Sequence, residues 1–103
     1  MMAKDVIVLK EVADDLNDGK AFYDKRNSGV GDYFWDSLLA DIESLILYAG
    51  VHSKEHGFYR MLAKRFPYAI YCHHIADEIA YVVAVLPMRR NPSWITRKIE
   101  GRS

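Results

Sequence analysis

The sequence predicts an α+β fold in which a helical hairpin packs on one face of a mainly antiparallel sheet. Apolar residues recur at helical spacing through the first half of the chain, and short β-branched and aromatic runs fill the second half. Helices followed by hairpin-connected strands are typical of α+β proteins. Because 103 residues build one core and rarely two, we expect a single domain over residues 1–103, with the element order β-α-α-β-β-β.

The first two elements follow from a change of period. Residues 6–9 form an unbroken apolar run, which predicts a short strand buried on both faces. Apolar or small residues then recur every three or four positions, at Val12, Leu16, Gly19 and Tyr23. The opposite side carries acids, which we interpret as a solvated helix face: Asp14, Asp15 and Asp18. This helix should end at 27–29, where Gly29 can adopt the left-handed conformation.

A second helix should follow, and its apolar stripe is clearer. Positions three or four residues apart carry Gly31, Phe34, Leu38, Ile42, Leu45 and Ala49. Gly50 stands where a helix stop belongs. Because a short polar turn joins the two helices, they should form an antiparallel hairpin.

The second half of the chain should form three strands. After a loop at 51–58, residues 59–63 suit the first strand, and Pro67 opens the second, which runs to residue 74. The third, at 78–86, is almost wholly apolar, which indicates a central strand covered on both faces. With the helices on one face of the sheet, the opposite face should be free to carry the function.

Charge is unevenly distributed along the chain. Lys and Arg together equal Asp and Glu, at 14 each, so the formal net charge is zero. Residues 1–59 carry six basic and eleven acidic side chains, whereas residues 60–103 carry eight and three. The basic half, with its tail at about 88–103, suits an anionic partner. The two halves could equally complement each other within the fold.

Composition excludes several classes of protein. A single cysteine cannot form a disulfide within the chain, and an unpaired thiol favours a reducing compartment. A hydrophobic content of 50% argues against disorder. No apolar run approaches the roughly 18 residues of a membrane span, and the first residues do not resemble a signal peptide. We therefore expect a cytoplasmic protein without a membrane partner.

Candidate metal and nucleophile sites are weak. His52 and His56 have a spacing that suits zinc on a helix, but the glutamate that should follow the first histidine of the metalloprotease motif is absent. His73 and His74 would point to opposite faces of a strand. Cys72 lies in an apolar strand, which is typical of a buried, inert thiol. We expect no metal and no cofactor.

The strongest candidate site is a set of basic and aromatic residues in the second half. They are Arg60, Lys64, Arg65, Arg89, Arg90, Trp94 and Arg97. Guanidinium groups beside an exposed ring suit a phosphate backbone with a stacked base, and they equally suit the carboxylates of a partner protein. A solvated sheet edge, with Trp94 packed over the core, would account for the same residues.

The same residues belong to an ordered set of short motifs. The set runs from Arg60-x-Leu62-x-x-x-Phe66-Pro67-Tyr68-Ala69-Ile70-Tyr71 through Ile79-x-x-Val82-x-Ala84-Val85 to Arg89-Arg90-Asn91-Pro92-x-Trp94-x-x-Arg97, with Gly31-Asp32-x-Phe34 upstream. It resembles the RelE/ParE superfamily, the toxins of bacterial type II toxin–antitoxin modules, often labelled plasmid-stabilisation proteins. The similarity covers nearly the whole chain and implies a RelE/ParE-like fold.

The resemblance also implies a function and a partner. Such toxins are neutralised by a cognate antitoxin whose C-terminal segment wraps the helices and the sheet, and a heterotetramer with the antitoxin is one assembly that the resemblance allows. RelE-like members cut messenger RNA in the ribosomal A site without a metal, using basic residues of the sheet and often a tyrosine near the C-terminus. ParE-like members instead inhibit DNA gyrase and are not known as nucleases.

The nuclease pattern transfers poorly to this sequence. Arg60 and either Arg89 or Arg90 can stand for the basic residues, but the arginine of the following strand falls at Ala69, and the C-terminal tyrosine has no counterpart. Pro87 occupies a position where many relatives carry histidine. A metal-free ribonuclease needs acid–base groups as well as electrostatic stabilisation, and only the latter is evident.

The sequence therefore favours a ParE-like toxin that inhibits a host target, with DNA gyrase as the expected one and without enzymatic activity of its own. Two alternatives stay open. One is a ribosome-dependent mRNA endoribonuclease of the RelE type that uses Arg60, Arg89 and Arg90. The other is a non-toxic binding relative. In each case the antitoxin should cover the basic residues, by strand addition or helix docking.

Overall fold

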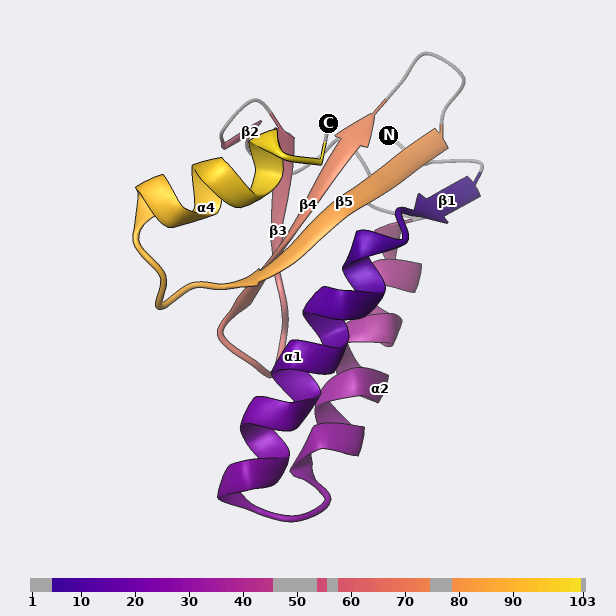
Figure 1. Ribbon diagram of the computed structural model, residues 1–103. Helices are drawn as coiled ribbons and strands as arrows, with labels where there is room; N and C mark the ends of the chain where they lie inside the picture. The colour runs from indigo at the N-terminus through magenta and orange to yellow at the C-terminus, as the bar shows by residue number, and fades with distance from the viewer. Residues whose placement is uncertain (1–4, 46–53, 56–57, 75–78, 103) are drawn as a thin grey trace.

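The computed structural model describes residues 5–45, 54–55, 58–74 and 79–102, and in this part of the chain three helices enclose a five-stranded sheet (Figure 1). The elements are β1 (Asp5–Val8), α1 (Glu11–Arg26), α2 (Val30–Glu43), β2 (Lys54–Glu55), β3 (Phe58–Leu62), β4 (Tyr68–His74), β5 (Ile79–Pro87) and α4 (Pro92–Glu100). The α+β class is confirmed, and so is the order β-α-α-β-β-β of the main elements. Two elements are additional: β2, in a segment expected to be a loop, and α4, which the predicted order lacks.

The predicted helical hairpin is confirmed, and glycines set how closely α1 and α2 pack. Gly29, with a φ of 92°, adopts the left-handed conformation just before α2. A Cβ at Gly19 would lie 2.4 Å from the ring of Phe34, so a larger residue has no room there. Asp24 Oδ1 accepts a hydrogen bond of 2.7 Å from the Gly31 N–H, which satisfies a donor that the first turn of α2 leaves free.

The predicted apolar stripe of the second helix extends beyond the end of α2. α2 ends at Glu43, although Leu45 beyond it is still fully buried. The predicted continuation through Ala49 to a stop at Gly50 lies outside the described residues. Across the described ranges, no helix combines the length and the apolar character needed to cross a membrane.

The sheet has the strand order β1-β5-β4-β3-β2 and is antiparallel except where β1 pairs with β5. The prediction of a mainly antiparallel sheet is thus confirmed. The prediction that the first strand is buried on both faces is wrong, because β1 is an edge strand whose Ile7 and Val8 are 37% and 44% exposed. Its apolar run reflects the preference of β-branched residues for strands rather than their burial.

Two apolar cores lie on opposite faces of β4 and β5. The face toward α1 and α2 carries Tyr68, Ile70, Cys72, Val82 and Val85. The other face carries Ala69, Tyr71, Val83, Ala84 and Leu86, which pack with Ile95 and Ile99 of α4. β5 is therefore covered on both faces, as predicted. The expectation that the sheet face opposite the helical hairpin is free is wrong, because α4 covers β4 and β5 on that face.

A β-bulge in β5 adjusts the sheet to both cores. Tyr71 pairs with Ala84 and Cys72 pairs with Val82, which leaves Val83 as an extra residue on β5. Val83 and Ala84 both belong to the core under α4, whereas Val82 belongs to the core under the hairpin. The bulge thus shifts the alternation of side chains between the faces by one residue.

Candidate functional site

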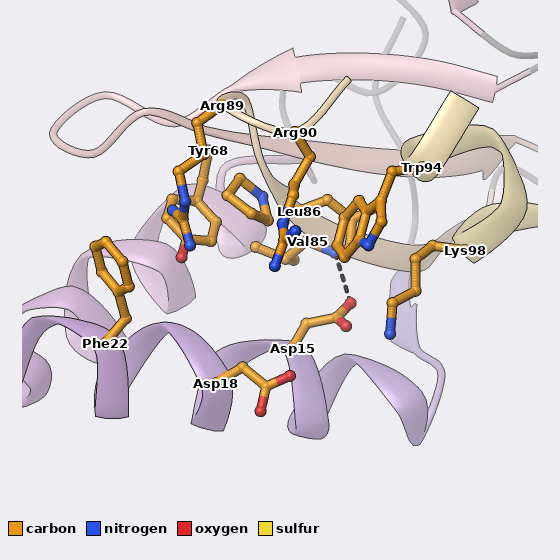
Figure 2. Close-up of a pocket in the computed structure, with 11 residues that line it drawn as sticks. Asp15, Asp18, Phe22, Tyr68, Val85, Leu86, Arg89, Arg90, Trp94 and Lys98 are labelled. Carbon is orange, nitrogen blue, oxygen red and sulfur yellow. Dashed lines mark hydrogen bonds between the residues drawn. The ribbon is translucent and has the colours of Figure 1, made fainter. Parts of the chain in front are cut away.

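A cleft of about 120 Å³ lies between α1, the end of β5 and α4 (Figure 2). Its lining consists of Asp15, Asp18 and Phe22 of α1, Tyr68 of β4, Val85, Leu86 and Pro87 of β5, Arg89 and Arg90 in the following turn, and Trp94 and Lys98 of α4. Acids on one wall thus face cations on the other. The acidic and basic halves of the chain meet in this cleft.

One end of the cleft is closed by a buried ion pair. Arg102 donates to both oxygens of Asp15, from Nη1 at 2.5 Å and from Nη2 at 2.6 Å. Only 9% of the Arg102 side chain and 4% of the Asp15 side chain are exposed. The hydrogen bond to Asp15 raises the pKa of the Arg102 guanidinium, which stays charged.

The buried pair also satisfies the backbone of β5 where β1 stops. β1 ends at Val8, and the Leu9 N–H still donates to the carbonyl of Val82. The next groups on this edge, the Val83 carbonyl and the Val85 N–H, would be buried without a strand partner. The Arg102 guanidinium donates to the Val83 carbonyl at 3.2 Å. The Asp15 carboxylate accepts from the Val85 N–H at 2.9 Å, the bond drawn in Figure 2.

The interpretation of the acids on the first helix as a solvated face is correct for two residues and wrong for one. Asp14 and Asp18 are exposed. Asp15 is only 6% exposed. Asp15 is buried because α1 packs there against the edge of β5 that β1 leaves uncovered. Helical spacing alone does not predict this contact.

At the other end of the cleft, cationic side chains lie against aromatic rings. The guanidinium carbon of Arg89 is 4.1 Å from the centre of the Phe22 ring. Arg90 lies 4.6 Å and the Lys98 Nζ 5.5 Å from the centre of the Trp94 ring. Within the described part of the chain, these three cations have no carboxylate at ion-pair distance. Cation–π contacts hold such charges in place without neutralising them.

The start of α4 positions the side chains that it contributes. The Trp94 N–H donates a hydrogen bond of 2.8 Å to Asn91 Oδ1, and Pro92 occupies the first helical turn. From there Trp94 and Lys98 lie four residues apart, which aligns them along one side of the helix. Both line the cleft that α1 also lines, and Arg102, two residues beyond the end of α4, meets Asp15 of α1.

Three of the predicted site residues come together in the cleft: Arg89, Arg90 and Trp94. Lys64 and Arg65 are exposed in the turn between β3 and β4, at the same end of the sheet. A hydrogen bond of 2.9 Å from the Met88 N–H to the Pro67 carbonyl joins that turn to the end of β5. Buried Asp41 of α2 fixes the turn further by accepting from the Lys64 N–H at 3.1 Å.

The other two predicted site residues lie apart from the cleft. Arg60 is on β3, where it pairs with Tyr71, two strands away from the edge of β5 that the cleft follows. Arg97 is exposed on the side of α4 opposite the buried Ile95 and Ile99. The basic residues therefore form separate surfaces rather than one continuous patch.

The lining residues that the sequence does not identify as site residues include Asp15, Asp18, Phe22 and Lys98. Lys98 has a usable signal, because Asn91-Pro92 is a helix-start signature and a helix there places Lys98 one turn after Trp94. The three residues of α1 have none. Their contribution depends on how α1 crosses the sheet, which no local pattern encodes.

The expectations for reactive groups have different outcomes. Cys72 is 1% exposed, as predicted, and burial raises the pKa of its thiol to about 11. His73 is exposed on β4. His52, His56 and the side chain of His74 lie outside the described residues. Elsewhere in the described chain, no three His, Cys, Asp or Glu side chains are grouped as metal ligands.

No protein-family model matches the sequence, and no curated protein matches it either. The class of protein is therefore defined by the fold and the cleft: a small α+β protein with a cationic cleft between its first and last helices. Three cations converge there, and guanidinium and ammonium groups bind oxyanions. The cleft offers less for proton transfer, since histidine is absent from its described lining.

Proposed function

We propose that the chain is the toxin of a type II toxin–antitoxin module of the RelE/ParE superfamily, and that it inhibits a cytoplasmic host target, with DNA gyrase as the expected one. One observation carries the proposal. The segments that hold the resembling motifs form α2, β3, β4 and β5 of the β-α-α-β-β-β order, and the Arg89–Arg97 motif forms the following turn and the start of α4. The motifs as far as β5 therefore lie on the elements that the resemblance implies.

Two positions favour target inhibition over RNA cleavage. Ala69, where RelE-like enzymes carry an arginine, is 1% exposed and packs in the core under α4. Pro87, where many relatives carry histidine, lines the cleft without offering a proton donor or acceptor on its side chain. Cleavage without a metal needs groups that take and give a proton beside the scissile phosphate. Neither position supplies one.

A ribosome-dependent endoribonuclease of the RelE type is the second candidate, and the composition of the cleft favours it. Arg89, Arg90 and Lys98 line one cleft with Asp18 on the opposite wall, which combines phosphate-binding cations with a carboxylate. Because Arg60 lies two strands away, such an enzyme would use a different set of residues from the one predicted.

One experiment decides between the candidates by measuring both activities. Expression without an antitoxin should arrest growth, and the purified protein at micromolar excess should block supercoiling by gyrase. Cuts in translated messages, mapped by primer extension, together with unaffected gyrase would replace the inhibitor by the endoribonuclease. Normal growth on expression would instead leave a non-toxic binding protein.

The cognate antitoxin is proposed to cover the basic residues with an acidic segment, because exposed guanidinium groups form paired hydrogen bonds with carboxylates. Replacing Arg89 and Arg90 together by Glu should weaken the toxin–antitoxin complex at least tenfold in calorimetry. The separate variant Arg60→Glu reports whether the antitoxin also reaches β3. Unchanged affinity in both variants would show that the antitoxin binds another surface.

A further inference from the structure

The open end of the cleft gathers positive charge that the protein itself does not neutralise. Arg89, Arg90 and Lys98 line it, whereas Asp15 is already used by the buried ion pair. Of the described lining residues, Asp18 is the remaining carboxylate, so two positive charges are left over. Like charges held close together repel one another, and this arrangement therefore gains stability when an anion binds.

The cations are already supported in the absence of a ligand. Arg90 and Lys98 both lie against Trp94, and Arg89 lies against Phe22. In Figure 2 the side chains of Arg90 and Lys98 extend toward α1, so their charged ends lie over the cleft. Long side chains lose rotamer freedom when they bind a ligand, and support by the rings reduces that loss.

Size and charge together select the kind of anion. The cleft is small, with a volume of about 120 Å³. It has room for a phosphate group but not for a folded segment. The two surplus charges match a phosphomonoester, which carries about −1.5 to −2 at pH 7. A carboxylate, or a phosphodiester inside a nucleic-acid strand, carries a single charge and would leave one cation uncompensated.

We propose that the cleft between α1 and α4 binds a phosphomonoester, the doubly charged terminal phosphate of a free nucleotide or of a 5′-phosphorylated strand. Arg90 and Lys98 donate to the phosphate, with Arg89 beside them, and Asp18 accepts from a hydroxyl of the ligand. This site is independent of the toxin assignment, because the charges and the size of the cleft define it whatever the protein's target is.

Calorimetric titration of the full chain with 5′-AMP, 3′,5′-cyclic AMP and adenosine tests the site. The three probes share base and sugar and differ in carrying a phosphomonoester, a phosphodiester or no phosphate. We expect 5′-AMP to bind at least tenfold more tightly than cyclic AMP, and adenosine to show no binding. Equal affinities of 5′-AMP and cyclic AMP, or no binding of 5′-AMP at millimolar concentration, would overturn the proposal.

Hexathymidylate with and without a 5′-phosphate distinguishes the two sources of the ligand. Tighter binding of the phosphorylated strand than of 5′-AMP assigns the site to strand ends, and weaker binding assigns it to free nucleotides. If the strand with a 5′-hydroxyl binds as tightly as the phosphorylated strand, the cleft recognises the internal backbone and the proposal is wrong.

Surface variants show where 5′-AMP binds without disturbing the core. Lys98→Met and Arg90→Met should each weaken 5′-AMP at least tenfold, because each removes a charge-assisted hydrogen bond. Lys10→Met removes an exposed cation outside the cleft and should leave the affinity within twofold. Equal losses in all three variants would indicate general attraction and contradict a site.

Discussion

The two ends of the cleft between α1 and α4 contain the same kinds of charge in opposite environments. At the closed end, Asp15 and Arg102 are buried, form paired hydrogen bonds and also bond the backbone of β5. At the open end, Arg89, Arg90 and Lys98 are exposed and rest on aromatic rings. Burial therefore assigns the first pair to folding, and exposure leaves the second group available to a ligand.

The largest effect is expected from Asp15→Ala, which leaves Arg102 buried without its partner and the Val85 N–H without its acceptor. Breaking a buried ion pair by removing one member costs about 3–5 kcal/mol, and the free energy of unfolding should fall by that amount. Urea denaturation followed by circular dichroism measures it. The matched control Asp14→Ala, at an exposed neighbouring position, should stay within about 0.5 kcal/mol. Equal losses would contradict a folding role for the closed end.

A smaller loss is expected from Arg102→Lys, which keeps the charge and removes the planar fork. One ammonium on a flexible stem cannot reproduce the paired bonds to Asp15 together with the bond to the Val83 carbonyl. The free energy of unfolding should decrease by about 1–2 kcal/mol. The same denaturation experiment on Arg97→Lys, at an exposed position of α4, should show no change. Full stability of Arg102→Lys would mean that charge alone holds the closed end together.

The open end should contribute little to folding. Arg89→Ala removes an exposed cation whose guanidinium lies over the half-buried ring of Phe22. Cation–π contacts at exposed sites are worth about 0.5–1 kcal/mol, so the loss should not exceed about 1 kcal/mol. Thermal or urea denaturation of this variant beside Asp15→Ala compares the two ends directly. A loss as large as that of Asp15→Ala would remove the distinction between them.

The smallest effect is expected at an ion pair on the surface. Lys20 Nζ lies 3.0 Å from Asp32 Oδ1, but the two side chains are 40% and 77% exposed. The hydrogen bond to Asp32 raises the pKa of Lys20, yet water screens the pair. Lys20→Ala should leave the urea midpoint unchanged within error. A measurable shift of the urea midpoint would show that the exposed Lys20–Asp32 pair also contributes to stability, as the buried Asp15–Arg102 pair does.

Elements that depend on local pattern could be predicted from the sequence. β4 ends at His74, as predicted, and begins at Tyr68, one residue after the predicted start at Pro67, because Pro67 and the aromatic run mark it locally. The α1–α2 hairpin and its left-handed Gly29 are correct for the same reason. The burial of β1 was not predictable in this way, because an apolar run looks the same at an edge as in the centre of a sheet.

The candidate site was predictable only in part. Arg89, Arg90 and Trp94 stand out as a basic group with an aromatic residue, and they do line the cleft. The cleft itself needs α4, which the predicted element order lacks although Pro92 suits the first turn of a helix. The spacing of Asp15 is that of any solvated acid on a helix. Asp15 is buried because β1 ends at Val8 and leaves an edge of β5 for it to bond.

Capping of β5 also protects the molecule against aggregation. Where a strand extends beyond its neighbour, its free backbone groups can pair with another chain. Here Arg102 occupies the Val83 carbonyl and Asp15 occupies the Val85 N–H. Pro87, two residues further along β5, has no N–H to offer. A strand from a second molecule could not form hydrogen bonds with these groups, because they are already bonded or absent. The buried ion pair therefore disfavours edge-to-edge pairing of two molecules.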